Sequence, residues 1–525
     1  MTGRFGIEPA LCLLAAIIVA CAGNDALSPR QPTLPLPPDP EPVKPPAVGS
    51  SNRDDSDTRL SGLGPLELSL EGAAISALRN NRDLRVRKLT AEVQAAVAES
   101  AQGKFDTELF ADFQYGQERT VESARSTEEQ FDVEGRQTSS VLGVRQKFST
   151  GTELEASVEH EFSASSRTPE QQRARLGLTV TQALLRGFGP EVNLAEIEQA
   201  DLEVQASRHE LRGYAETIIS ETELAYWRYV LAEREIAIYQ ESLEVTRRQR
   251  DEIEQEIEVG TLAQMESAAA SAEVALREQE LIEARSIFEQ QRLRLLRVVG
   301  ADLGRKLIAT SDPSLKPEPV DDLDERLKLA ERSRAEINEA LLRLEEKRLE
   351  TVVTRNGLLP RLDFFITLGK TGFAADFPGS FRQLTGDTFD ILGGLSLSYM
   401  VQGSAAQGAN RAAFASRKQA ERALDNLRQM VRLEVQIAAT EVERARQQIS
   451  ASAATRKLQE QKVLVEQERF RVGESTALML AQAQRDLLSS RIAEIKALVD
   501  YRSALVELYR AEGTLLERRG IRVGN

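Results

Sequence analysis

The chain contains a long internal repeat. In the first copy Gly260 precedes Gly300 by 40 residues, and in the second copy Gly473 precedes Gly513 by 40 residues, so both glycines recur at an offset of 213 (473 − 260 and 513 − 300). The motif Val-Gly-x-x-[Ala/Thr]-x-[Met/Leu]-x-x-Ala surrounds Gly260 and Gly473. The stretch 193–300 thus has a copy at 410–513, and the offset of 213 between the paired glycines indicates a tandem duplication. The chain is therefore expected to form two half-units of one body.

The pattern in each copy of the repeat predicts two long helices joined by a short turn. Helix-forming residues dominate the stretch and no proline follows Pro190 within it, while Leu224, Trp227, Leu231 and Ile238 form one apolar stripe. A helix from residue 194 to residue 258 would be about 95 Å long, which requires partners along its whole length. A solvated coiled coil would show the same pattern. The predicted turns are Val259-Gly260-Thr261 and Val472-Gly473-Glu474.

Composition narrows the class of protein. The 28% of charged residues carry a formal net charge of -15, which argues against binding nucleic acid. The two cysteines are Cys12 and Cys21, so the rest of the chain holds no disulfide framework and no cysteine metal site.

The N-terminus predicts a lipoprotein signal peptide over residues 1–20. Arg4 precedes the apolar run 11–20, and Ile-Val-Ala-Cys at 18–21 resembles a bacterial lipobox, which makes Cys21 the predicted lipidation site. An ordinary secretory signal is the alternative. Ala22 after the cysteine suggests sorting to the outer membrane by resemblance to Gram-negative lipoproteins. Nine of the 18 prolines lie between Pro29 and Pro46, so residues 21–61 are predicted to be an extended tether.

Two further helices are expected, over residues 66–102 and 321–355, and strands follow each of them. The strands alternate apolar residues with acidic or hydroxyl-bearing ones. Four are predicted in the first copy, at 105–115, 142–148, 152–162 and 176–184, and two in the second, at 362–368 and 389–399. The extra length of the first copy corresponds to one hairpin, residues 141–162.

Such strands suit a membrane-spanning barrel wall, although an ordinary sheet with one solvated face has the same alternation. Six strands are too few for a single-chain barrel, so several chains are expected to pool their strands. The predicted fold is mainly α with a transmembrane β part. Its predicted divisions are a first repeat at 62–312, a second repeat at 313–518 and a C-terminal tail at 519–525.

The chain resembles the TolC-type outer-membrane efflux proteins. The matching segments, in the correct order, are Leu-Ser-Leu-Glu and Asn-Asn-Arg-Asp-Leu within 68–84, Leu-Thr-Val-Thr-Gln to Gly-Phe-Gly at 178–189, Gly-Leu-Leu-Pro at 357–360, both Val-Gly turns, and 470–487.

This resemblance implies a homotrimer, with a β-barrel in the outer membrane continued by an α-helical barrel across the periplasm. It implies a passive exit duct of a tripartite efflux or type I secretion system, which docks to a periplasmic adaptor (membrane fusion) protein and an inner-membrane transporter. On this basis Val259, Gly260, Thr261, Val472, Gly473 and Glu474 are candidate adaptor-docking turns. Some relatives have acidic residues six and nine positions beyond the second turn glycine, whereas this chain has Met479 and Gln482 there. Glu266, six positions beyond Gly260, is the candidate pore-lining carboxylate.

No pattern in the sequence predicts an enzyme, a cofactor site or a metal site. The two histidines, His160 and His209, lie 49 residues apart and are assigned to a strand and a helix. Two alternatives to the duct remain open. A periplasmic adaptor would show one hairpin within a small β-domain, and a structural coiled-coil lipoprotein would not need six amphipathic strands.

Overall fold

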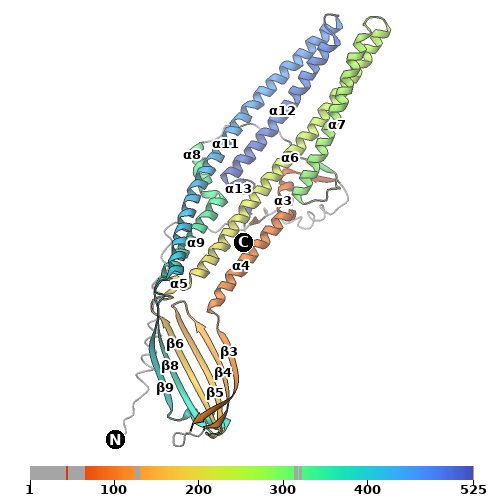
Figure 1. Cartoon of the computed structure of the whole chain (residues 1–525). Helices are drawn as coiled ribbons and strands as arrows, with labels where there is room; N and C mark the ends of the chain where they lie inside the picture. The colour runs from red at the N-terminus through yellow and green to blue at the C-terminus, as the bar shows by residue number, and fades with distance from the viewer. Residues whose placement is uncertain (1–42, 45–64, 124–129, 313–316, 318–321, 524–525) are drawn as a thin grey trace. The chain divides into compact units, whose positions relative to one another are not determined.

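The computed structural model describes residues 43–44, 65–123, 130–312, 317 and 322–523 (Figure 1). The predicted signal peptide, Cys21 and all of the tether except 43–44 lie outside the described residues. The chain divides into two units. One contains Val93–Val204 and Leu342–Arg422, and the other contains Pro37–Glu92, Gln205–Leu341 and Ala423–Asn525.

The first unit is built on one six-stranded antiparallel sheet with the order β3-β4-β5-β6-β8-β9. Five of its six strands are longer than the sequence predicts, in part because the alternation at the ends of β3 and β4 includes charged residues that an apolar pattern does not detect. The bounds are β3 Glu108–Ser123, β4 Gln130–Lys147, β5 Thr152–Ser165, β6 Gln171–Ala183, β8 Arg361–Ala374 and β9 Phe389–Ser398.

The extra hairpin of the first copy belongs to this sheet. Residues 141–162 fall in β4 and β5, which pair with each other and with the neighbouring strands β3 and β6. The hairpin is therefore part of the wall formed by the sheet and not an external loop.

Two long helical hairpins account for most of the second unit. They are α6 Ala195–Glu258 with α7 Met265–Val299, and α11 Ser404–Arg471 with α12 Ala477–Glu512. The 64 residues of α6 correspond to about 96 Å of helix. The predicted long helices and the turns that join them are confirmed. The helices begin and end within a few residues of the predicted positions.

The two shorter predicted helices are each broken in the middle. The first is α3 Leu70–Asn80 and α4 Arg82–Gln102, and the second is α8 Leu323–Ser333 and α9 Ala335–Asn356. At the breaks Asn81 and Arg334 have extended backbones, with ψ of 125° and 122°. Asn81 Oδ1 accepts hydrogen bonds from the amides of Asp83 and Leu84, a local capping arrangement that competes with a continuous helix. A single helix over each stretch was therefore the wrong prediction.

The predicted start of the first helix was also wrong. Leu66–Leu68 forms strand β2, which pairs in parallel with β7 Leu307–Ala309, and the helix starts at Leu70 after the N-cap Ser69. Leu66, Leu68 and Leu307 are buried there. An apolar run of three residues contains too little periodicity to distinguish a strand from a helix turn.

The core of the helical unit gathers around aromatic residues of α6. Tyr226, Trp227 and Tyr229 are nearly inaccessible, and they pack with Leu295, Leu296 and Val299 of α7. The hydroxyls of Tyr226 and Tyr229 donate hydrogen bonds to the carbonyl oxygens of Leu68 and Leu307. Tyr226 and Tyr229, which lie beside the predicted apolar stripe and not in it, therefore fix α6 to the β2–β7 pair.

The two copies pack their broken helices in the same way. Gly300 lies against the Asn80 carbonyl and Gly513 against the Arg334 backbone, so that a Cβ atom would come within 2.5 Å and 2.9 Å of those atoms. Asn81 Nδ2 donates to the Val298 carbonyl, and Arg334 donates to the Ala511 carbonyl, which is the position 213 residues later. The duplication in the sequence is thus repeated in the tertiary contacts.

The remaining elements are short. They are α5 Pro190–Asn193, α10 Phe377–Arg382, α13 Leu515–Arg518, the 3-10 turns η1 Gly103–Phe105 and η2 Gln383–Thr385, and β1 Val43–Lys44 paired with β10 Arg522–Val523. Among the described helices, none combines the length and the apolar character that crossing a membrane requires.

Candidate channel wall and hairpin tips

One face of the sheet is apolar and exposed. The strand register aligns Leu109, Val144, Ala156, Leu178, Leu368 and Ile391 in one row across all six strands. Leu109 is 73% exposed and Leu395, on the same face, is 66% exposed. A continuous exposed apolar surface of this kind normally contacts a lipid phase or another protein.

The opposite face carries charged side chains joined by arginine. Arg145 on β4 bridges Glu108 on β3 (3.2 Å) and Glu155 on β5 (2.9 Å). Arg175 on β6 makes the same kind of bridge, to Glu159 on β5 (3.1 Å) and Asp390 on β9 (2.8 Å). Three of these pairs link neighbouring strands, and the Arg175–Asp390 pair reaches across β8, on a face that requires water.

The sequence pattern showed the acidic residues of this face, but it did not identify the arginines as their partners. Finding Arg145 and Arg175 requires the register, because their partners lie 10 to 215 residues away on strands whose pairing the pattern leaves open. Aligning the predicted strands by their turns would have supplied the β4–β5 pairs.

The sheet has two edges with one neighbour each. Within the described residues β3 pairs only with β4, and β9 pairs only with β8. A long edge strand presents a row of unpaired backbone donors and acceptors. These edges are therefore surfaces where further strands can be added.

The hairpin tips are two copies of one turn. Gly260 and Gly473 have φ of 85° and 78°, the left-handed region that glycine adopts readily. In each turn the glycine amide and the following amide bond back to the helix: Gly260 to Ile257 and Thr261 to Glu256, then Gly473 to Phe470 and Glu474 to Arg469. This is a Schellman arrangement, which ends a helix and reverses the chain.

Both tips expose apolar side chains around these glycines. Val259 is 77% exposed and Met265 is 76% exposed in the first hairpin. Val472, Leu478 and Met479 are similarly open in the second. Exposed apolar residues at the end of a long hairpin have the character of a contact surface for another protein.

A family model matches part of the chain. The family model described as outer membrane efflux protein matches residues 327–514. Residues 327–514 form an outer membrane efflux protein domain.

Solved structures with the same fold extend over nearly the whole chain. The outer-membrane channel OprN has 18% sequence identity and a TM-score of 0.63, with 90% of this chain and 98% of that chain covered. CusC, described in terms of transmembrane channel formation, has 15% identity and a TM-score of 0.64 over 92% and 99% of the two chains. The open state of the Neisseria gonorrhoeae MtrE outer membrane channel has 17% identity and a TM-score of 0.63 over 92% and 98%.

These likenesses show the fold. Among curated protein sequences, none matches this chain significantly. The efflux protein domain covers most of the second copy, and the first copy is tied to it by the shared turns and packing described above.

Glu266 lies in the first turn of α7, where it contacts the efflux protein domain. Its Oε2 accepts a hydrogen bond from the Ala477 amide (3.2 Å) at the start of α12. Ala477 is buried with Ile253 and Ala270, with Phe470 packed against them, so the two hairpin tips share a small apolar cluster. Met479 and Gln482 lie in the first two turns of α12, and Gln482 donates to Asp486 (3.0 Å).

Buried charged groups form a second set that the sequence did not reveal. Glu223 is inaccessible and accepts two hydrogen bonds from Arg519 (both 2.6 Å). Glu216 is buried near Arg212 (3.8 Å), and burial raises the pKa of Glu216 to about 8. Both carboxylates are on α6, where the charged composition gave no sign that particular residues are buried.

The histidines occupy the predicted element types. His160 lies on β5 beside Phe377 and Phe381 of α10, and His209 lies on α6. Within the described residues no group of three or more histidine, cysteine, aspartate or glutamate side chains comes close enough to hold a metal ion.

Proposed function

We propose that this chain is a subunit of an outer-membrane exit duct, a passive conduit of a tripartite efflux or type I secretion system. The observation that carries the proposal is the sheet, which has an exposed apolar face, a charged face and two unpaired edges. A sheet in contact with lipid on one side and water on the other needs all three features, since closure into a barrel leaves no edge in the membrane.

The chain acts as a homotrimer on this proposal. Six strands from each of three copies give a barrel of about 18 strands, which is wide enough for an aqueous channel. Exposed apolar stripes on two helices support association of copies. One comprises Val86, Leu89, Val93 and Val97 on α4, and the other comprises Met430, Leu433 and Ile437 on α11.

The proposal places the duct in the outer membrane, anchored by lipid on Cys21 and extending into the periplasm. The tip residues Val259, Gly260, Thr261, Val472, Gly473 and Glu474 are the proposed docking points for a periplasmic adaptor protein, which connects the duct to an inner-membrane transporter. The exposed apolar side chains beside the turn glycines support this role. Glu266, Met479 and Gln482 are the proposed lining residues at the same end.

Conductance across a planar lipid bilayer tests the proposal. The full chain, purified as an assembled oligomer, should produce stepwise channel currents. Heat-dissociated chain at the same concentration is the control and should produce none. Absence of current from a verified oligomer would overturn the duct.

A further inference from the structure

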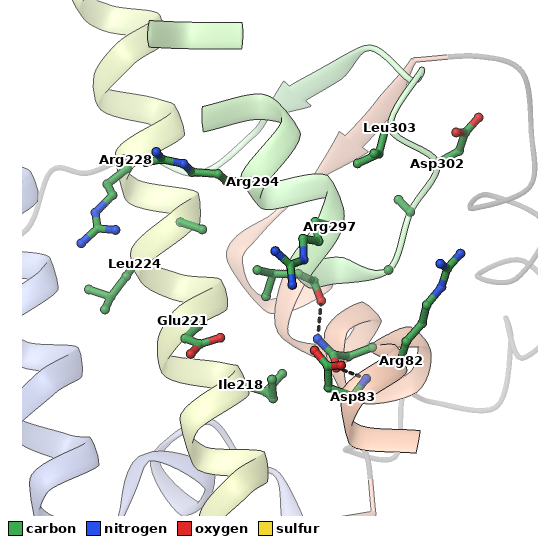
Figure 2. A pocket seen from close by; sticks show the side chains of 15 residues that line it. Arg82, Asp83, Ile218, Glu221, Leu224, Arg228, Arg294, Arg297, Asp302 and Leu303 are labelled. Carbon is green, nitrogen blue, oxygen red and sulfur yellow. Dashed lines mark hydrogen bonds between the residues drawn. The ribbon is translucent and has the colours of Figure 1, made fainter. Parts of the chain in front are cut away.

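Two grooves on the helical unit are copies of each other. The first, of ≈ 800 Å³, is lined by α6, by the end of α7 and the loop after it, and by residues 81–83 (Figure 2). The second, of ≈ 710 Å³, is lined by α11 and α12. Positions 221, 224, 225, 228, 294, 297 and 298 of the first recur 213 residues later, as 434, 437, 438, 441, 507, 510 and 511 of the second.

The second groove has a partner that the first groove lacks. Leu224 and Arg228 of α6 line it, so the first copy of the repeat contacts the groove of the second copy within one chain. The positions equivalent to Leu224 and Arg228 are Ile437 and Glu441 on α11. No residue of α11 or α12 lines the first groove, and Ile437 is 61% exposed.

At two of the seven equivalent positions the charge is reversed between the two grooves, and the first groove as a whole is lined by four arginines and three carboxylates. Arg228 and Arg294 of the first groove correspond to Glu441 and Glu507 of the second. Arg228, Arg294 and Arg297 are exposed, and they make no ion pair with any of the described residues. Figure 2 shows these three arginines on α6 and α7, with Arg82 on the adjoining helix. The first groove therefore offers unpaired cations beside the apolar surface of Ile218 and Leu224.

We infer that the occupant of the first groove is a second copy of this chain, inserting the Ile437–Glu441 face of its α11. The inference rests on the proposed function, since it deepens the homotrimer by assigning the residues of the joint between chains. The contact of Leu224 and Arg228 with the second groove shows the geometry that Ile437 and Glu441 would repeat in the first groove of another copy. Glu441 would bring a negative charge to the arginines of the first groove, which have no ion-pair partner among the described residues. The Glu441 carboxylate bonds Arg444 on its own helix (2.5 Å), a half-exposed pair that solvent screens and that leaves room for further cations.

A sign test at Ile437 distinguishes the two grooves. If Ile437 enters the cationic groove of a neighbouring chain, Ile437→Glu should associate better than Ile437→Lys, although both lose the same apolar contact. If Ile437 interacts only with the groove of its own chain, which is lined by four acidic and four basic side chains, the two variants should associate equally well. Light scattering of the detergent-purified full chain should find the trimer-to-monomer midpoint of Ile437→Lys at about tenfold higher protein concentration than that of Ile437→Glu.

A second substitution identifies the partner. Arg294→Glu should restore association when combined with Ile437→Lys, whereas Arg285→Glu on the same helix, outside the groove, should not. Circular dichroism of each variant checks that the helices form. Equal midpoints for the lysine and glutamate variants, or no rescue by Arg294→Glu, would overturn the inference. This experiment measures the mass of the oligomer and not channel current. A wild-type trimer that fails to conduct would therefore contradict the proposed duct but not the proposed contact between chains.

A disulfide cross-linking experiment tests the same contact if the charge variants fail to fold. Arg294→Cys with Ile437→Cys should give covalently linked chains on a non-reducing gel. The equivalent within-chain pair, Glu507→Cys with Leu224→Cys, should leave the mass of one chain. The proposed contact is supported if the Arg294→Cys, Ile437→Cys double variant forms linked chains and neither single cysteine variant does. It is contradicted if an assembled trimer of the double variant shows no linkage.

Discussion

The Ala477 amide donates a hydrogen bond to the Glu266 carboxylate, so a side chain in the first turn of α7 caps the first turn of α12. The second copy has no equivalent carboxylate cap, because the position that corresponds to Glu266 there is Met479. A negative charge at a helix N-terminus interacts favourably with the helix dipole as well as with the unpaired amide. Glu266 thus joins the two hairpin tips of one chain.

Removing this cap should loosen the start of α12. Glu266→Ala should cost about 1 kcal/mol locally, and amides near Ala477 should exchange hydrogen faster by mass spectrometry. Glu266→Gln retains a carbonyl acceptor and should exchange at nearly the wild-type rate. If both variants reduce the preference of the channel for cations while only the alanine variant changes exchange, the carboxylate also lines the passage. Unchanged exchange in Glu266→Ala would show that the cap contributes nothing.

The tip glycine should tolerate asparagine and reject valine. No atom lies within 4 Å of a Cβ placed on Gly473, so the whole cost of substitution comes from its φ of 78°. A left-handed residue with a Cβ costs about 1–2 kcal/mol, and more when it is β-branched, whereas asparagine visits this region readily. Gly473→Val is expected to impair export in cells while leaving trimers intact, and Gly473→Asn is expected to preserve both. Wild-type export by the valine variant would remove Gly473 from the docking surface.

Glu216 should make the protein less stable as pH rises. Its pKa is raised from 4.5 to about 8 in the folded chain, chiefly by burial, and Arg212 offsets only part of that effect. Between these two values the folded state binds more protons than the unfolded state, so unfolding free energy falls with pH, by up to about 1.4 kcal/mol per unit. The melting temperature of the detergent-solubilised protein should therefore be lower at pH 8.5 than at pH 5.5.

Glu216→Gln isolates this contribution. Glutamine stays neutral, so the variant should melt at a higher temperature than wild type at pH 8.5 and should show a smaller pH dependence. Glu233→Gln, at an exposed position of the same helix, is the matched control and should behave like wild type. A Glu216→Gln protein that melts earlier than wild type at pH 8.5 would mean that the charged form is the stable one.

Substitution by arginine should have different effects at two adjacent residues of β4. Leu142 belongs to the apolar face and is 54% exposed, whereas Val141 faces the other way, between Asp112 and Glu159 on its neighbours. An arginine facing lipid costs about 2–4 kcal/mol near the membrane midplane. Leu142→Arg is expected to reduce the amount of protein in the outer membrane fraction, and Val141→Arg to leave it near the wild-type level. Equal amounts of the two variants would contradict the assignment of lipid to the apolar face.

The sequence predicted best the features that depend on repeated patterns. The helical hairpins, the number of strands and the position of the turns follow from periodicity and from the offset between Gly260 and Gly473. The breaks at Asn81 and Arg334 could not be found that way. Each depends on bonds to a carbonyl more than 170 residues away, which the periodicity of the segment itself does not show.

The chemistry of the surfaces was less predictable. Glu266 was selected by comparison of positions, but its bond to Ala477 depends on how two hairpins meet. The cross-strand arginines, Arg145 and Arg175, depend on strand register, and the raised pKa of Glu216 depends on burial that a charged helix sequence conceals. The proposed homotrimer came from the family resemblance, because the structure of one chain does not contain the other copies.

The bare edges of β3 and β9 bear on how the protein is made. On the proposed function, a newly secreted chain has an exposed apolar sheet face and two unpaired edge strands until other copies join it, and such a chain aggregates readily. Folding of the sheet and recruitment of sister chains are then one process whose yield depends on how many chains are present together. Dilution should slow maturation, and escort by a holding chaperone should speed it.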